Sequence, residues 1–131
     1  MQENSLIKGI QDIMRQDVGV DGDAQRLSQL SWLLFLKILD DQDQELEVLE
    51  KKFSNTLDVN YRWRNWAGNR EGLTGEKLIN FINSELFPYL KSLKKSKHNF
   101  DRSILVKEVF KDSYNYMKSG QLLRQVINKI N

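Results

Sequence analysis

One stretch of the sequence, residues 61 to 70, interleaves arginines with aromatic side chains in a pattern that suits nucleic acid. It reads Tyr-Arg-Trp-Arg-Asn-Trp-Ala-Gly-Asn-Arg. A guanidinium group pairs with a phosphate through a planar fork of donors, and an aromatic ring beside it can stack on a base or a sugar. We therefore single out Arg62, Arg64 and Arg70 as candidate DNA contacts.

A second interpretation of the same stretch is structural. Tyr61, Trp63 and Trp66 would fasten a loop to the rest of the protein, because large rings favour a pocket over water, while the arginines would only face solvent. The two interpretations are compatible. On the first, replacing Arg64 by alanine would change stability little and would weaken assembly on DNA.

A short basic run provides the other candidate contacts. Residues 94 to 99 contain no apolar side chain, which predicts an exposed turn. Lys94, Lys95 and Lys97 in this turn are candidate DNA contacts that would position a phosphate backbone without reading base sequence. The only histidine of the chain, His98, lies among them, and we interpret it as a surface residue and not as a catalytic base.

Several chemistries are excluded by what the sequence lacks. Cysteine is absent, which removes thiol catalysis, zinc ribbons and disulfides. The glycines between residues 68 and 75 have the wrong spacing for a phosphate-binding loop and follow no strand. The acidic run that starts at Asp40, when counted from Asp41, carries Leu46 and Lys52 where a calcium loop needs glycine and glutamate. We assign no catalytic, cofactor-binding or metal-binding residue.

Charge is distributed unevenly along the chain. The 131 residues hold 20 basic and 18 acidic side chains, but the first fifty hold four bases and eleven acids, a charge of −7. The remainder holds sixteen bases and seven acids, a charge of +9. Such a division suggests that one face meets an anionic partner, and ordinary solvated helix faces would also account for it.

Apolar residues recur at spacings of three and four, which predicts an all-α fold: a compact bundle of about five helices in one domain, residues 1–131. The first helix would follow a cap at Asn4 or Ser5 and end near Gly19. The second would follow a cap at Asp21 or Asp23 and continue, half exposed, to about residue 53. Its stretch from residue 32 to 39 is apolar almost all round, which is typical of a central helix.

The second half of the chain has the same helical spacing after one long gap. Residues 54–74 predict an irregular connection that aromatic side chains anchor. A helix would follow Thr74 and be kinked or restarted at Pro88. Another would begin at a cap on Asp101 and include Tyr114, and a last helix would follow Gly120. The longest apolar run is five residues, far short of a membrane span, and we predict a soluble cytoplasmic protein.

Five blocks in this order resemble the amino-terminal helical domain of the M (modification) subunit of type I restriction-modification systems. The blocks are Asp23-Ala24-Gln25-Arg26-Leu27, residues 30–37, residues 63–67, residues 78–83 and Leu86-Phe87-Pro88. The resemblance covers essentially the whole chain.

The resemblance implies a parent subunit that transfers a methyl group from S-adenosylmethionine to the N6 of adenine in a two-part DNA target. Its catalytic domain would carry a glycine-rich cofactor loop and an Asn-Pro-Pro-aromatic motif. Neither is present here, where the one proline is Pro88. The implied partners are the subunit's own methyltransferase domain, the specificity (S) subunit, a second M subunit and double-stranded DNA, with no membrane.

We therefore expect a fragment or short form of such a subunit, acting as an interaction and DNA-clamping module without activity of its own. One alternative is a freestanding helical protein that binds nucleic acid directly. Another is a structural adaptor that binds protein through an exposed apolar strip on the last helix, formed by Leu123, Val126, Ile127 and Ile130.

Overall fold

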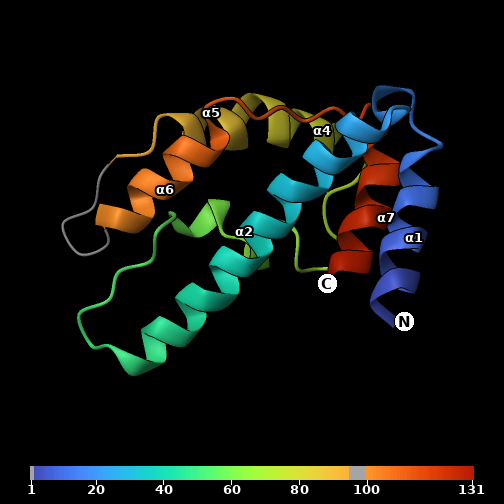
Figure 1. The fold of residues 1–131 in the computed structure, drawn as a ribbon. Coiled ribbons are helices and arrows are strands. Elements are labelled where there is room, and N and C mark those ends of the chain that lie inside the picture. Colours follow the sequence, from blue (N-terminus) through green and yellow to red (C-terminus); the bar gives the residue numbers. More distant parts are fainter. Residues whose placement is uncertain (1, 95–99) are drawn as a thin grey trace.

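The computed structural model describes residues 2–94 and 100–131, and these residues form helices and loops without any strand (Figure 1). The longer elements are α1 (Gln2–Met14), α2 (Asp23–Leu49), α4 (Gly75–Phe81), α5 (Phe87–Lys91), α6 (Phe100–Phe110) and α7 (Gly120–Ile130). Shorter ones are η1 (Val18–Val20), η2 (Val59–Tyr61) and α3 (Trp63–Trp66). The predicted all-α fold is confirmed.

Helix α2 is the central element, as its apolar stretch predicts. Figure 1 shows it crossing the molecule, with α5 and α6 on one side and α1 and α7 on the other. Trp32 is 1% exposed, and its ring is arranged edge to face with those of Phe87 and Phe110, at centroid distances of 4.9 and 6.4 Å. Such edge-to-face pairs add to the stability that burial of the rings supplies.

Helix α4 continues into α5 through a π-helical turn, η3 (Ile82–Leu86). Pro88 lies in the first turn of α5, where it lacks the N–H that an α-helix would direct to the carbonyl four residues earlier. The interruption predicted at Pro88 therefore takes the form of a wider turn just before it. The successive elements α4, η3 and α5, from residue 75 to residue 91, correspond to the single helix predicted after Thr74.

Several predicted helix ends were wrong. Asn4 and Ser5 lie inside α1, Gly22 and not an aspartate precedes α2, and Asp101 lies inside α6. Helix α1 ends at Met14, well before Gly19, because the Asp17 side chain accepts the Gly19 N–H at 2.8 Å and shapes a separate 3₁₀ turn.

The segment 111–119 is a turn followed by irregular chain, although Tyr114 was predicted to be helical. Buried Gln29 of α2 explains the difference. Its amide oxygen accepts the Tyr116 N–H at 2.8 Å, and its amide nitrogen donates to the Asn115 side chain at 2.8 Å. These bonds replace the backbone bonds of a helix, so a tertiary contact overrides the local apolar spacing.

The apolar strip of α7 is buried, which overturns the adaptor alternative. Leu123, Val126 and Ile127 are each 0% exposed, and Ile130 packs against the same core. Figure 1 places α7 beside α1. Among the residues described, no helix is both long enough and apolar enough to cross a bilayer.

Candidate functional site

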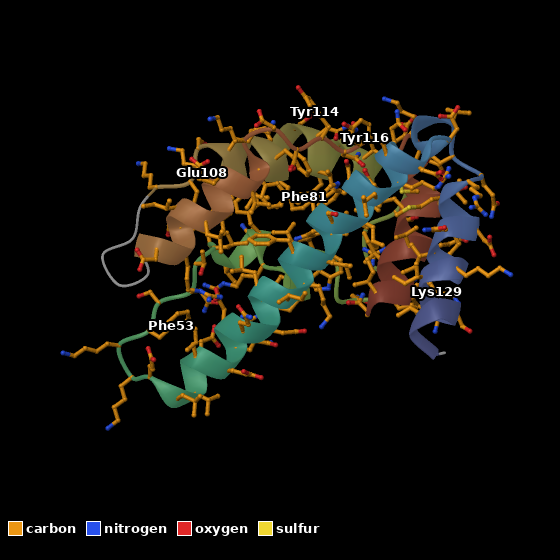
Figure 2. All side chains as sticks on the ribbon, in the orientation of Figure 1. Phe53, Phe81, Glu108, Tyr114, Tyr116 and Lys129 are labelled. Carbon is orange, nitrogen blue, oxygen red and sulfur yellow. The ribbon has the colours of Figure 1, made fainter. Side chains whose placement is uncertain are left out.

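The aromatic side chains of residues 61–70 anchor the long connection, as the structural interpretation predicts. Tyr61 stacks on Tyr89 at a centroid distance of 4.0 Å and an interplanar angle of 13°, and on Phe81 at 6.1 Å. The Tyr89 hydroxyl accepts the Asp58 N–H at 2.8 Å, and burial raises the pKa of Tyr89. Figure 2 shows Phe81 among the interior side chains. The start of the connection is thereby held against the run from α4 to α5.

The two tryptophans of this stretch lie in the core. Trp63 is 2% exposed, and its indole N–H donates to the Asn131 side chain at 2.8 Å. Trp66 is 5% exposed and packs against Trp63 at 5.2 Å and against Phe81 at 5.6 Å. Both belong to the one-turn helix α3, a turn within the region predicted to be irregular. Their spacing of three places both rings on one side of that turn.

Arg64 is held by carboxylates of α2 and does not simply face water. Its Nε and Nη2 donate to Asp40 at 2.9 to 3.2 Å, and Nη2 also reaches Glu47 and the Asn55 side chain, each at 3.3 Å. Burial lowers the pKa of Arg64, but the hydrogen bonds to Asp40 and Glu47 outweigh it and leave the pKa above its ordinary value. The side chain is an anchor between α3 and α2.

A second arginine makes a parallel connection one helical turn further along α2. Asp43 is 2% exposed and accepts the Thr56 N–H at 2.9 Å. The Arg102 guanidinium of α6 donates to the same carboxylate through Nε at 3.0 Å and Nη2 at 2.5 Å. The acidic run that we rejected as a calcium site thus contributes two aspartates, Asp40 and Asp43, that bind distant segments to α2.

The remaining candidate DNA contacts lie in different environments. Arg62 is half-buried, and its Nε donates to the Leu57 carbonyl at 2.9 Å. Arg70 and Lys94 are exposed. Two further candidates, Lys95 and Lys97, lie outside the described residues, as does His98.

Sequence reasoning missed Arg124, which organises the end of the long connection from α7. Its side chain donates to four backbone carbonyls: Nε to Leu73 at 2.7 Å, Nη1 to Ala67 and Asn69 at 3.0 Å each, and Nη2 to Trp66 at 3.2 Å. Burial lowers the pKa of Arg124. The available signal was its position, because residue 124 falls on the same face of α7 as Ile127, three residues later, which is buried.

Asp17 was also missed, and it connects the loop after α1 to the segment just before α7. Its carboxylate is 3% exposed and accepts the Lys118 N–H at 2.9 Å and the Ser119 N–H at 2.8 Å. Ser119 in turn caps α7, where its hydroxyl accepts the Leu122 N–H at 3.1 Å. This carboxylate fixes where α7 begins relative to α1.

These contacts define a helical scaffold domain in which a few charged side chains hold distant segments together: Asp17, Asp40, Asp43, Arg64, Arg102 and Arg124. No set of three or more histidine and acidic side chains in residues 2–94 and 100–131 is arranged as metal ligands would be.

Comparison with known proteins identifies the family. Residues 4–130 match the family described as the HsdM N-terminal domain, and the chain belongs to that family. It is 56% identical over 131 residues to the type I restriction enzyme EcoEI methylase subunit of Escherichia coli.

Two solved structures share the fold. A modification subunit of a putative type I restriction enzyme from Vibrio vulnificus YJ016 superimposes with a TM-score of 0.90 at 42% identity over 98% of this chain. A second chain, from a study of complex assembly and conformational transition of the type I R-M system, gives a TM-score of 0.82 at 32% identity over 95% of this chain.

The chain corresponds to only part of these proteins. It spans 27% of the length of the E. coli subunit, and 30% and 24% of the two chains of known structure. The resemblance to the helical domain of an M subunit is thereby confirmed, and the domain is that of a type I restriction-modification methylase subunit.

Proposed function

We propose that this domain serves as the interaction and DNA-clamping module of a methyltransferase subunit that modifies the N6 of adenine at a two-part DNA target. The parent subunit would take the methyl group from S-adenosylmethionine in a separate catalytic domain. The module would contact that domain, the specificity subunit, a second M subunit and the DNA duplex. Because DNA is the proposed substrate, a cytoplasmic location is part of the proposal.

One observation carries this proposal: the whole chain is 56% identical to about a quarter of an E. coli protein named as a methylase subunit. The match extends over the whole chain and not over one segment of it. The fold agrees with such a role, because ion pairs to the buried aspartates Asp40 and Asp43, together with stacked rings, hold its segments in one arrangement.

All the candidate DNA contacts remain part of the proposal, but they differ in how freely they can reach a phosphate. Arg70 and Lys94 are exposed and free to approach phosphate, and Lys95 and Lys97 are retained from the sequence alone. Arg62 has one nitrogen occupied by a carbonyl. Arg64 would act through Nη1, because its Nε and Nη2 are bonded to Asp40.

The experiment is reconstitution of the full-length subunit with its specificity subunit, with and without residues 1–131. We expect the intact complex to methylate adenine in duplex DNA and the truncated complex to lose most of its DNA affinity. The isolated domain should bind duplex weakly or not at all. Full, salt-sensitive affinity of the isolated domain would favour a freestanding nucleic-acid-binding protein, and undiminished methylation by the truncated complex would refute the clamping role.

A further inference from the structure

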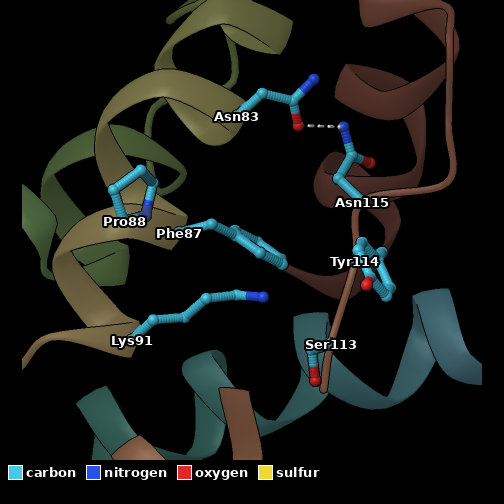
Figure 3. Close-up of a pocket in the computed structure, with 7 residues that line it drawn as sticks. All are labelled: Asn83, Phe87, Pro88, Lys91, Ser113, Tyr114 and Asn115. Atoms are coloured by element: carbon cyan, nitrogen blue, oxygen red, sulfur yellow. Dashed lines mark hydrogen bonds between the residues drawn. The ribbon is translucent and has the colours of Figure 1, made fainter. Parts of the chain in front are cut away.

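Two hollows between α5, α6 and the non-helical segment 111–119 share one lysine. The first has a volume of about 370 Å³, and the second one of about 540 Å³. The first is lined by Asn83, Phe87, Pro88, Lys91, Ser113, Tyr114 and Asn115 (Figure 3). The second is lined by Lys91, Ile104, Lys107, Glu108 and Lys111. We call the two hollows together the α5–α6 groove.

The groove gathers positive charge that the protein leaves unpaired. Lys91, Lys107 and Lys111 line it, and Glu108 is the single carboxylate among the described lining residues. Within the described part of the chain, none of the three lysines has an ion-pair partner, whereas Arg64 and Arg102 do. Unneutralised like charges around one hollow repel each other and attract an anion.

The groove wall that carries Tyr114 is held in place. Asn115 donates to the Asn83 side chain at 3.2 Å, as Figure 3 shows, and accepts from Gln29 at 2.8 Å. Tyr114 beside it is 62% exposed, and the Lys91 ammonium lies 5.0 Å from the centre of its ring. This cation–π contact directs the Lys91 ammonium toward the groove.

A purely structural explanation exists for two of the lysines. Lys91 and Lys107 lie in the last turns of α5 and α6, where a positive charge offsets the partial negative charge of the helix end. That explanation concerns each helix separately. It accounts neither for the meeting of both lysines with Lys111 at one hollow nor for the exposed ring of Tyr114.

We propose that the α5–α6 groove binds the sugar-phosphate backbone of duplex DNA. Lys91, Lys107 and Lys111 contact phosphates as point charges, and the Tyr114 hydroxyl donates to a phosphate oxygen. A single strand would stack its bases on a free ring, but Lys91 already lies over one face of Tyr114. This inference rests on the proposed function for the identity of the anion, and it places a DNA contact at residues that the sequence did not single out.

The test compares two triple variants of the full-length subunit assembled with its specificity subunit. One variant is Lys91→Gln, Lys107→Gln, Lys111→Gln in the groove. The matched control is Lys8→Gln, Lys77→Gln, Lys129→Gln, which removes the same charge from exposed sites on α1, α4 and α7. Duplex affinity is measured between about 50 and 200 mM salt, where each lost phosphate contact flattens the log-log slope by about 0.9.

We expect the groove variant to flatten the slope by about 2 to 3 and to keep its melting temperature, while the control keeps the wild-type slope. A lower melting temperature with an unchanged slope would establish the helix-end explanation and overturn the groove. Equal losses of duplex affinity in the groove variant and the control would also overturn the groove. So would a groove variant that loses more affinity for single-stranded than for duplex DNA. If the wild-type complex itself binds no duplex, the proposed function fails. If the wild-type complex binds duplex and the groove variant binds it equally well, only the groove proposal fails.

Discussion

The Arg64 guanidinium lies against the Asp40 carboxylate, with Nη2 2.9 Å from Oδ1, and the same carboxylate accepts the Arg64 backbone N–H at 3.0 Å. The Asp40 side chain is 6% exposed, whereas that of Arg64 is 27% exposed. One aspartate of α2 therefore holds both the backbone and the side chain of α3. The interleaved stretch is fixed to the central helix by charge as well as by its rings.

This pair changes the expected effect of Arg64→Ala. The substitution would leave the buried Asp40 carboxylate without its cation, which is a costly state. We expect a loss of about 2 to 4 kcal/mol in the free energy of unfolding, below the loss for a fully buried pair because Arg64 is partly exposed. Urea denaturation of the variant measures it. A change under about 0.5 kcal/mol would restore the solvent-facing interpretation of Arg64.

Arg64→Lys is the control for geometry. Lysine keeps the positive charge but cannot reproduce the planar fork that spans both Asp40 oxygens. We expect it to recover part of the lost stability. If it recovers all of it, charge alone and not the bidentate geometry stabilises the contact.

Trp32→Ala should remove the centre of the core. The side chain is 1% exposed and touches the rings of Phe87 and Phe110. We expect a loss of about 3 to 5 kcal/mol, measured by chemical denaturation. Trp32→Phe is the matched variant: the buried indole N–H of Trp32 has no hydrogen-bond partner in the described structure, so only volume is lost. A loss from Phe as large as that from Ala would contradict this account.

Helical periodicity predicted the elements well because burial of one apolar face is recorded directly in the spacing of residues. The all-round apolar stretch of α2 correctly indicated a central helix, and the rings of residues 61–70 correctly indicated an anchored connection. Trp32, Trp63 and Trp66 all lie at most 5% exposed. In each case the element is stabilised by burial of large apolar side chains, and the residue type alone shows that a side chain is large and apolar.

Long-range polar contacts were not predictable in the same way. Nothing in the local sequence shows that Gln29 binds segment 111–119, that Asp17 binds the start of α7, or that Arg124 binds four carbonyls. A charged side chain in sequence has the same appearance whether it ends in water or on a distant backbone. For this reason the sequence did not show that Nε and Nη2 of Arg64, a candidate DNA contact, bond to Asp40 inside the protein.

Stability at low pH should depend on Glu47. The Asn55 amide and then Arg64 lower the pKa of Glu47, although partial burial opposes them. Because the folded state binds the proton less tightly than the unfolded state, Glu47 stabilises the fold above its ordinary pKa of about 4.3, and this contribution is lost as the pH falls through the lowered value. Thermal melts from pH 7 to pH 3 should show a shallower decline for Glu47→Gln than for wild type. Parallel curves would show that the contact has no energetic weight.

Arg124→Met should loosen the end of the long connection while leaving the helices in place. Methionine fills a similar apolar volume but offers no donor to the carbonyls of Trp66, Ala67, Asn69 and Leu73. Buried acceptors left unpaired cost about 1 to 3 kcal/mol each when water cannot replace the donor, and entry of water into this edge would reduce the total. We expect a net loss of about 2 to 4 kcal/mol.

The location of the effect distinguishes this role from general destabilisation. Hydrogen exchange should accelerate mainly in residues 63–75, whose backbone Arg124 holds, and little in α2, because local opening does not require global unfolding. Arg124→Lys is the control: one ammonium has three donors and cannot span four carbonyls, so it should protect this segment only partly. Uniform acceleration across all helices, or wild-type protection in the lysine variant, would contradict the assignment of Arg124 as the side chain that organises the connection.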